Sequence, residues 1–60
     1  MTYNIGDKVK IEVYVTAKRI RLVNCQITNK YIKNDNIYYT IKEINGSYIG
    51  TNIRENRFIQ

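Results

Sequence analysis

Acid–base and nucleophilic chemistry are the first possibilities that the side chains of this 60-residue chain raise. Both need groups paired in a cleft, where burial or a neighbouring charge shifts their pKa. The chain has no His to serve as a base for its single cysteine, and its three glycines form no phosphate-binding pattern. The five carboxylates are scattered along the sequence, at Asp7, Glu12, Asp35, Glu43 and Glu55. We therefore predict that the protein is not an enzyme.

The single cysteine, Cys25, is predicted to be a buried structural residue. By alternation it points to the same side of a strand as Val23 and Ile27. One cysteine forms no internal disulfide, which agrees with a reducing compartment, and without His it cannot build a structural zinc site. No stretch reaches the ~18 apolar residues of a membrane span, and the N-terminus lacks a signal-peptide pattern. We expect no metal, no cofactor, no membrane partner and a cytoplasmic location.

Binding of a macromolecule is the other kind of chemistry that the residues offer. The net charge is +5, which favours polyanions such as nucleic acids or acidic protein surfaces. The basic residues are spread along the chain, so a folded surface has to gather them. Two plainer roles compete with binding: lysines on a sheet exterior discourage edge pairing, and tyrosines lie flat over a thin core. The choice depends on the elements that position these side chains.

Composition indicates that these elements are strands. The chain has eleven Ile, four Val, six Tyr and one Phe, and such β-branched and aromatic residues favour sheets. A chain of this length buries only about 60% of its unfolded surface, so we expect one small all-β domain over residues 1–60. The heavy use of Ile, Asn, Lys and Tyr is also what A/T-rich codons produce, which hints at a low-GC bacterium or one of its phages.

Alternation of apolar and polar residues predicts where the strands lie. It is clearest over residues 8–15, with Val9, Ile11, Val13 and Val15 on the inner side. The run over residues 19–33 is apolar in two phases, so we predict a β-bulge or sharp bend near Leu22 and Val23. Residues 34–36 form a turn by composition, because Asn and Asp tolerate left-handed backbone.

The register of the hairpin after residue 37 is predicted by parity. A two-residue loop would set Lys42 opposite Ile49 and mix core with surface, because directly opposed residues share a face. A three-residue loop at 44–46 pairs Ile41 with Ile49 instead and places Gly46 at the left-handed position of a G1 bulge. Residues 52–55 then resemble a minimal capping box, which predicts one 3₁₀ turn before a brief last strand.

Three stretches carry a resemblance to the SH3-like small β-barrels: Ile5–Val9, Tyr38–Ile41 and Asn52–Asn56. The chain is similar to the bacterial and phage stand-alone type, in the KOW and Tudor-like branch. It lacks the tryptophan and the acidic, aromatic first loop of the peptide-binding signalling SH3 domains. The resemblance implies a five-stranded barrel with a 3₁₀ turn before its last strand. It implies binding but no particular partner, because this fold hosts many functions.

Two binding surfaces are predicted on the outside of such a barrel. Protein docking is favoured, since tyrosines are enriched at the centres of interfaces. The docking residues are Tyr38, Lys42, Tyr48 and Asn52. Nucleic-acid binding is the alternative, because a basic face with exposed aromatics holds phosphates and stacks bases. Its candidates are Lys8, Lys10, Tyr14, Arg19, Arg21, Lys30 and Lys33. The chain is thus expected to dock on a larger protein or protein–nucleic acid complex and modulate it, with a homodimer through an edge strand as a further expectation.

Overall fold

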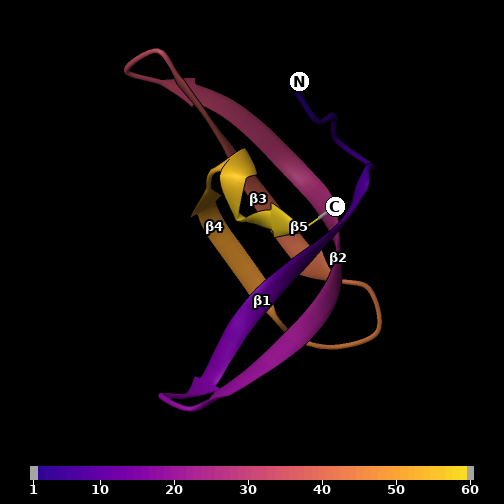
Figure 1. The fold of residues 1–60 in the computed structure, drawn as a ribbon. Helices are drawn as coiled ribbons and strands as arrows, with labels where there is room; N and C mark the ends of the chain where they lie inside the picture. The colour runs from indigo at the N-terminus through magenta and orange to yellow at the C-terminus, as the bar shows by residue number, and fades with distance from the viewer. Residues whose placement is uncertain (1, 60) are drawn as a thin grey trace.

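The computed structural model describes residues 2–59 as five strands and one 3₁₀ turn (Figure 1). The strands are β1 (Lys8–Thr16), β2 (Arg19–Lys33), β3 (Asn36–Glu43), β4 (Ile49–Ile53) and β5 (Phe58–Ile59), and η1 (Glu55–Arg57) is the 3₁₀ turn. The prediction of an all-β chain with a 3₁₀ turn before its last strand is confirmed.

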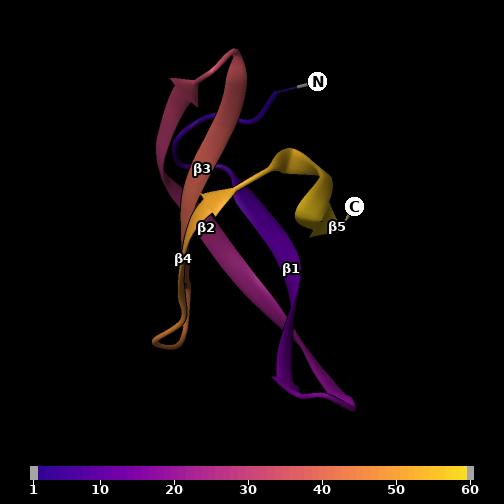
Figure 2. The ribbon, with the colours of Figure 1, turned by 90° about the vertical axis from the view of Figure 1, so that its left-hand side faces the viewer.

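All five strands belong to one antiparallel sheet in the order β4-β3-β2-β1-β5. Successive strands form hairpins from β1 to β4, and the short β5 returns to pair with Lys10 and Ile11 on β1. Within residues 2–59 no pairing joins β4 to β5, so the sheet is open there and closure into a barrel stays a prediction. Figure 2 shows the twisted sheet with the β3–β4 hairpin and the η1–β5 segment on opposite sides of the molecule.

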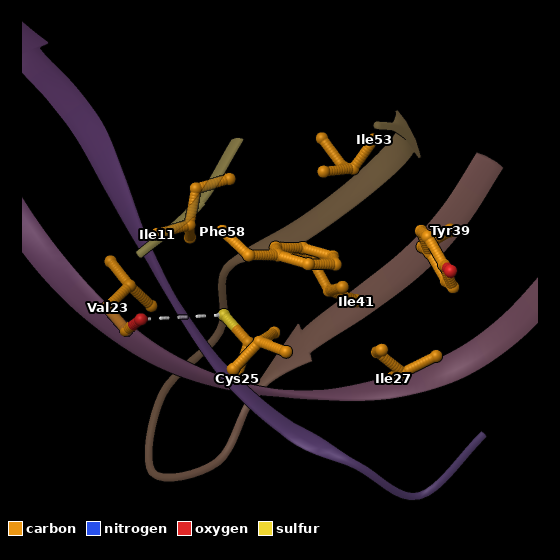
Figure 3. Close-up of a cluster of buried hydrophobic side chains, with 9 residues drawn as sticks. Ile11, Val23, Cys25, Ile27, Tyr39, Ile41, Ile53 and Phe58 are labelled. Atoms are coloured by element: carbon orange, nitrogen blue, oxygen red, sulfur yellow. Dashed lines mark hydrogen bonds between the residues drawn. The ribbon is translucent and has the colours of Figure 1, made fainter. Parts of the chain in front are cut away.

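One apolar cluster fills the inner face of this curved sheet (Figure 3). Every strand contributes, with Val9, Ile11, Val23, Cys25, Ile27, Tyr39, Ile41, Ile53 and Phe58 buried. The predicted alternation is confirmed at Val9 and Ile11, and Val13 packs partly against the cluster. Val15 is an exception with 59% of its surface exposed. The cause is its position near the tip of the β1–β2 hairpin, which projects past the other strands in both ribbon views (Figures 1 and 2).

Aromatic side chains link β3, β5 and the segment before β1 across the core. The rings of Tyr39 and Phe58 lie 5.5 Å apart, and Tyr3 meets both edge-on, with centroids 6.1 Å from Tyr39 and 5.0 Å from Phe58. The Tyr3 N–H donates to the buried Tyr39 hydroxyl over 3.1 Å. The hydroxyl therefore keeps a hydrogen-bond partner inside the protein, as a buried polar group requires.

Cys25 lies in the middle of this cluster with none of its surface exposed, as predicted. Its Sγ is 4.0 Å from the carbonyl oxygen of Val23. Burial raises the pKa of the thiol, because an apolar surrounding disfavours the thiolate. The residue acts as a small apolar side chain that fills the core.

The predicted bulge near Leu22 and Val23 is wrong. β1 and β2 pair without a shift from Lys8–Gln26 to Tyr14–Ile20. β2 buries only one of its two sets of alternating apolar residues, the set that contains Val23, Cys25 and Ile27. In the other set, Ile20 and Leu22 are 52% and 61% exposed. Register shifts occur elsewhere, between Tyr14 and Thr16 on β1 and between Ile27 and Asn29 on β2.

The predicted register of the β3–β4 hairpin is also wrong. Lys42 pairs with Ile49 and Ile41 with Gly50, and the loop between them is longer than three residues. Ile49 therefore faces outward, with 62% of its surface exposed, while Ile41 is fully buried.

Gly50 explains why this register is stable. A Cβ at Gly50 would lie 3.0 Å from the hydroxyl of Tyr48 and 3.2 Å from Cγ1 of Ile41, so these side chains occupy its place on the inner face. Asn52 then adopts a left-handed φ of 54° within a bulge, and Ile53 returns to the core opposite Tyr39. Simple alternation of inward and outward residues does not predict the bulge. The extra residue of a bulge moves every later side chain of the strand to the opposite face of the sheet.

Candidate docking site on the outer face

The outer face is the side of the sheet opposite the core, and its residues follow from the strand pairing. Directly paired residues share a face, and neighbours along a strand alternate. Because Val9, Cys25 and Ile41 are buried, the residues between them point outward. One row across the sheet is Lys8, Gln26, Lys42 and Ile49. The next row is Ile59, Lys10 and Asn24, followed by Ile44, whose N–H donates to the Asn24 carbonyl over 2.9 Å.

The outer face is hollowed between β5 and the β3–β4 loop. The hollow has a volume of about 590 Å³, and Leu22, Ile44 and Ile59 are its exposed aliphatic side chains. Lys8 and Lys10 also line it. A smaller hollow of about 180 Å³ shares Ile44 and reaches Lys42. We call the two together the outer groove, defined by Lys8, Lys10, Leu22, Lys42, Ile44 and Ile59.

The four residues of the predicted docking cluster do not come together. Lys42 lies on the outer face, as predicted, but Tyr48 packs partly against the core on the inner side. Asn52 is exposed and forms part of the bulge in β4. The register of the β3–β4 hairpin separates Tyr48 from Lys42. The Glu43 N–H donates to the Tyr48 carbonyl over 2.8 Å, so Tyr48 lies opposite Glu43, whereas the predicted register placed Tyr48 opposite Lys42.

Tyr38, the remaining member of that cluster, belongs to a different group of side chains. Its ring stacks on Tyr31 with centroids 5.7 Å apart and an angle of 23° between the planes. The Arg54 guanidinium lies 5.4 Å from the Tyr38 ring centroid, a cation–π arrangement. We call these three residues the tyrosine stack. Tyr31 could have been found from the sequence, because a two-residue turn at Asn34-Asp35 sets it opposite Tyr38.

The predicted nucleic-acid residues are divided among several parts of the molecule. Lys8 and Lys10 line the outer groove, and Tyr14 lies further along the same strand. Arg19 begins β2 beside the β1–β2 turn, while Lys33 precedes the β2–β3 turn at the other end of the molecule (Figure 1). Lys30 is partly buried and pairs with the core residue Tyr39. Arg21 shares the parity of Cys25, so it lies on the inner side of β2.

Arg21 is held by an ion pair with Glu43. Its two terminal nitrogens donate to the two carboxylate oxygens over 3.1 and 3.3 Å, and the Tyr48 N–H donates to Glu43 Oε1 over 3.3 Å. The hydrogen bond from Arg21 lowers the pKa of Glu43 below its usual range. A Cβ at Gly46 would collide with this carboxylate. The pair therefore fastens the β3–β4 loop, which carries Ile44 of the outer groove, to β2.

Replacing Glu43 with Gln is expected to remove part of the acid sensitivity of folding. The pKa of a Glu side chain is about 4.3 in an unfolded chain, and the pKa of Glu43 is lower in the folded protein. The ion pair therefore stabilises the fold fully at pH values above the unfolded pKa. The contribution is lost as pH falls through the folded pKa. Urea unfolding of both proteins at pH 7 and pH 3 should show a wild-type advantage that shrinks in acid. An equal difference at both pH values would contradict this, and Glu55→Gln on η1 is the control.

Among residues 2–59, no three Cys, Asp or Glu side chains are close enough together to hold a metal ion. The same residues include no helix long and apolar enough to cross a membrane. Comparisons with protein-family models, curated proteins and solved structures found no match to this chain.

Proposed function

We propose that this chain is a non-catalytic protein-docking module with an SH3-like small β-barrel fold, and that the outer groove is its working surface. The strand order supports the fold assignment: four strands follow one another in hairpins, and a 3₁₀ turn then leads into a short last strand beside the first. In this proposal the module occupies the surface of a larger protein, or of a protein–nucleic acid complex, and modulates it.

The observation that carries the proposal is the exposure of aliphatic side chains in one place. Leu22, Ile44 and Ile59 are 61%, 44% and 37% exposed and line the same hollow. Single apolar residues on a surface need no explanation, but several that gather in a concave, polar-rimmed patch mark an interaction site. A partner that covers them removes this apolar area from water, which is the main driving force of association.

The strand edges support docking through the face of the sheet. β5 pairs only with Lys10 and Ile11, so the rest of β1 beyond them is an edge of the sheet. On this edge β1 has one more residue than β2 between Tyr14 and Thr16. β4, at the other edge, carries the bulge at Asn52. Bulges twist an edge away from a straight partner and are a common protection against edge pairing. The homodimer through an edge strand stays a prediction, and sedimentation equilibrium tests it.

Nucleic-acid binding is the second candidate, and the tyrosine stack favours it. Two stacked tyrosines with an arginine resemble the platforms on which unpaired bases stack. The division of the basic residues counts against it: Arg21 is paired with Glu43, Lys8 and Lys10 line the outer groove, and Arg19 and Lys33 lie beside different hairpin turns. Salt separates the two candidates: affinity for duplex DNA falls with a log–log slope of about −0.9 per neutralised phosphate.

A pull-down from the cell that makes the protein tests the proposal. We expect the tagged chain to retain protein partners after nuclease treatment, and a Leu22→Ser/Ile44→Ser variant to lose them, because the groove is no longer apolar. Ile32→Ser is the matched control, since Ile32 is 72% exposed but lies on the β2–β3 hairpin. Circular dichroism checks that each variant folds. Capture that needs nucleic acid, or that survives the double substitution, would overturn the proposal.

A further inference from the structure

We infer that the partner segment that fills the outer groove is acidic as well as apolar, with Asp or Glu side chains flanking Leu, Ile or Phe. This inference rests on the proposed docking function and adds the chemical class of the partner.

The charges around the outer groove are mainly positive. Lys8, Lys10 and Lys42 are exposed on this face, and Glu12 lies on the same face opposite Leu22. Glu43 also borders the smaller hollow, but it is paired with the inward-facing Cys25, and Arg21 binds its carboxylate. The Asp7 carboxylate accepts the Asn4 N–H over 2.9 Å in the turn before β1. A carboxylate-bearing partner therefore meets attractive charge across most of the groove.

The lysines are placed to border an apolar chain on two sides. Lys8 and Lys10 are two residues apart on β1, so their Cα atoms lie about 7 Å apart. Lys42 is two strands away from Lys8 in the same row, a distance of about 10 Å. Ile44 ends the row of Lys10 and Asn24, and Leu22 lies in the following row, opposite Glu12. A segment that buries its apolar side chains on Leu22 and Ile44 thus brings neighbouring carboxylates within reach of the ammonium groups.

The floor of the groove excludes a plain polyanion as the best occupant. Its exposed apolar side chains are aliphatic, so they offer no aromatic surface on which a base stacks. Phosphates or carboxylates alone would leave Leu22, Ile44 and Ile59 uncovered. Exposed ion pairs contribute little by themselves, so apolar burial supplies the affinity. The lysines select the partner and speed its approach, as charges at the rim of an interface do.

Three synthetic peptides test this inference by NMR on the isotope-labelled chain. The first alternates Asp with Leu and Phe, the second replaces its Asp by Lys, and the third replaces its Leu and Phe by Ser. We expect only the first to shift the signals of Leu22, Ile44 and Ile59. Lys8→Glu/Lys42→Glu should weaken its binding about tenfold or more, because rim charges are reversed. The control Lys18→Glu/Lys33→Glu, at the two hairpin turns, should leave the affinity nearly unchanged.

Equal binding of the second or third peptide would overturn the inference, and so would the absence of binding by all three. The pull-down separates this failure from failure of the docking function. If native partners are lost with Leu22→Ser/Ile44→Ser but retained by Lys8→Glu/Lys42→Glu, docking stands and the acidic class of partner is wrong. If both variants lose them, the inference is supported.

Discussion

Ile41→Ala is expected to remove about half of the free energy of unfolding of the protein. Ile41 is fully buried on the inner face of β3. Truncation of such a side chain costs about 2–5 kcal/mol, from lost burial and from the cavity that remains. At about 0.05–0.15 kcal/mol per residue, a chain of this length has only about 3–9 kcal/mol of stability in total. Urea unfolding followed by circular dichroism measures the loss.

Ile49→Ala is the matched control for this substitution. It removes the same atoms from the same hairpin, but Ile49 is 62% exposed on the outer face. A surface substitution of this kind changes stability by about 0.5 kcal/mol or less. Equal destabilisation by the two variants would show that Ile41 and Ile49 face the same way, as in the three-residue loop that the sequence favoured. The pair therefore tests the register on which the outer face depends.

Gly50→Val should destabilise the protein, although valine is a better strand residue than glycine. The new Cβ would meet the Tyr48 hydroxyl at 3.0 Å and Ile41 Cγ1 at 3.2 Å, and valine adds two methyl groups beyond it. Overpacking of this kind costs about 1–3 kcal/mol. We expect a lower urea midpoint and a Tyr48 ring displaced into solvent, detectable from its NMR signals.

Thr51→Val is the control for this substitution, because Thr51 is the exposed neighbour in the same strand. It should leave the urea midpoint nearly unchanged. If Gly50→Val stabilises the protein, position 50 has room for a side chain, and the close packing of Tyr48 and Ile41 around it is wrong.

Alternation made the strands and most of the core predictable from the sequence. Val9, Ile11, Cys25 and Ile41 each follow from a simple period of two. The register of the β3–β4 hairpin could not be predicted in this way. The bulge at Asn52 adds one residue to β4, so Ile53 faces the core although Ile49, at the same parity in the sequence, faces outward. Parity also does not tell which apolar phase of a strand is buried. The two phases of β2 therefore predict a bulge or sharp bend near Leu22 and Val23, whereas Leu22 is an exposed residue in a regular part of the β1–β2 pairing.

The sequence predicted the lysines of the outer groove but not its aliphatic residues. Lys8, Lys10 and Lys42 were all expected to face outward, and they do. Leu22, Ile44 and Ile59 were not predicted as site residues. In a chain with so small a core, the simplest prediction places every apolar residue in the interior. Two of them, Ile44 and Ile59, come from segments that only the pairing of the sheet brings into the row of Lys10 and Asn24.

NMR mapping of the captured partner on the labelled chain is the most direct test of the outer groove as the docking surface. We expect the perturbed signals to centre on Leu22, Ile44 and Ile59. Perturbations that centre instead on the tyrosine stack of Tyr31 and Tyr38 would contradict it, as would perturbations along the edge of β4.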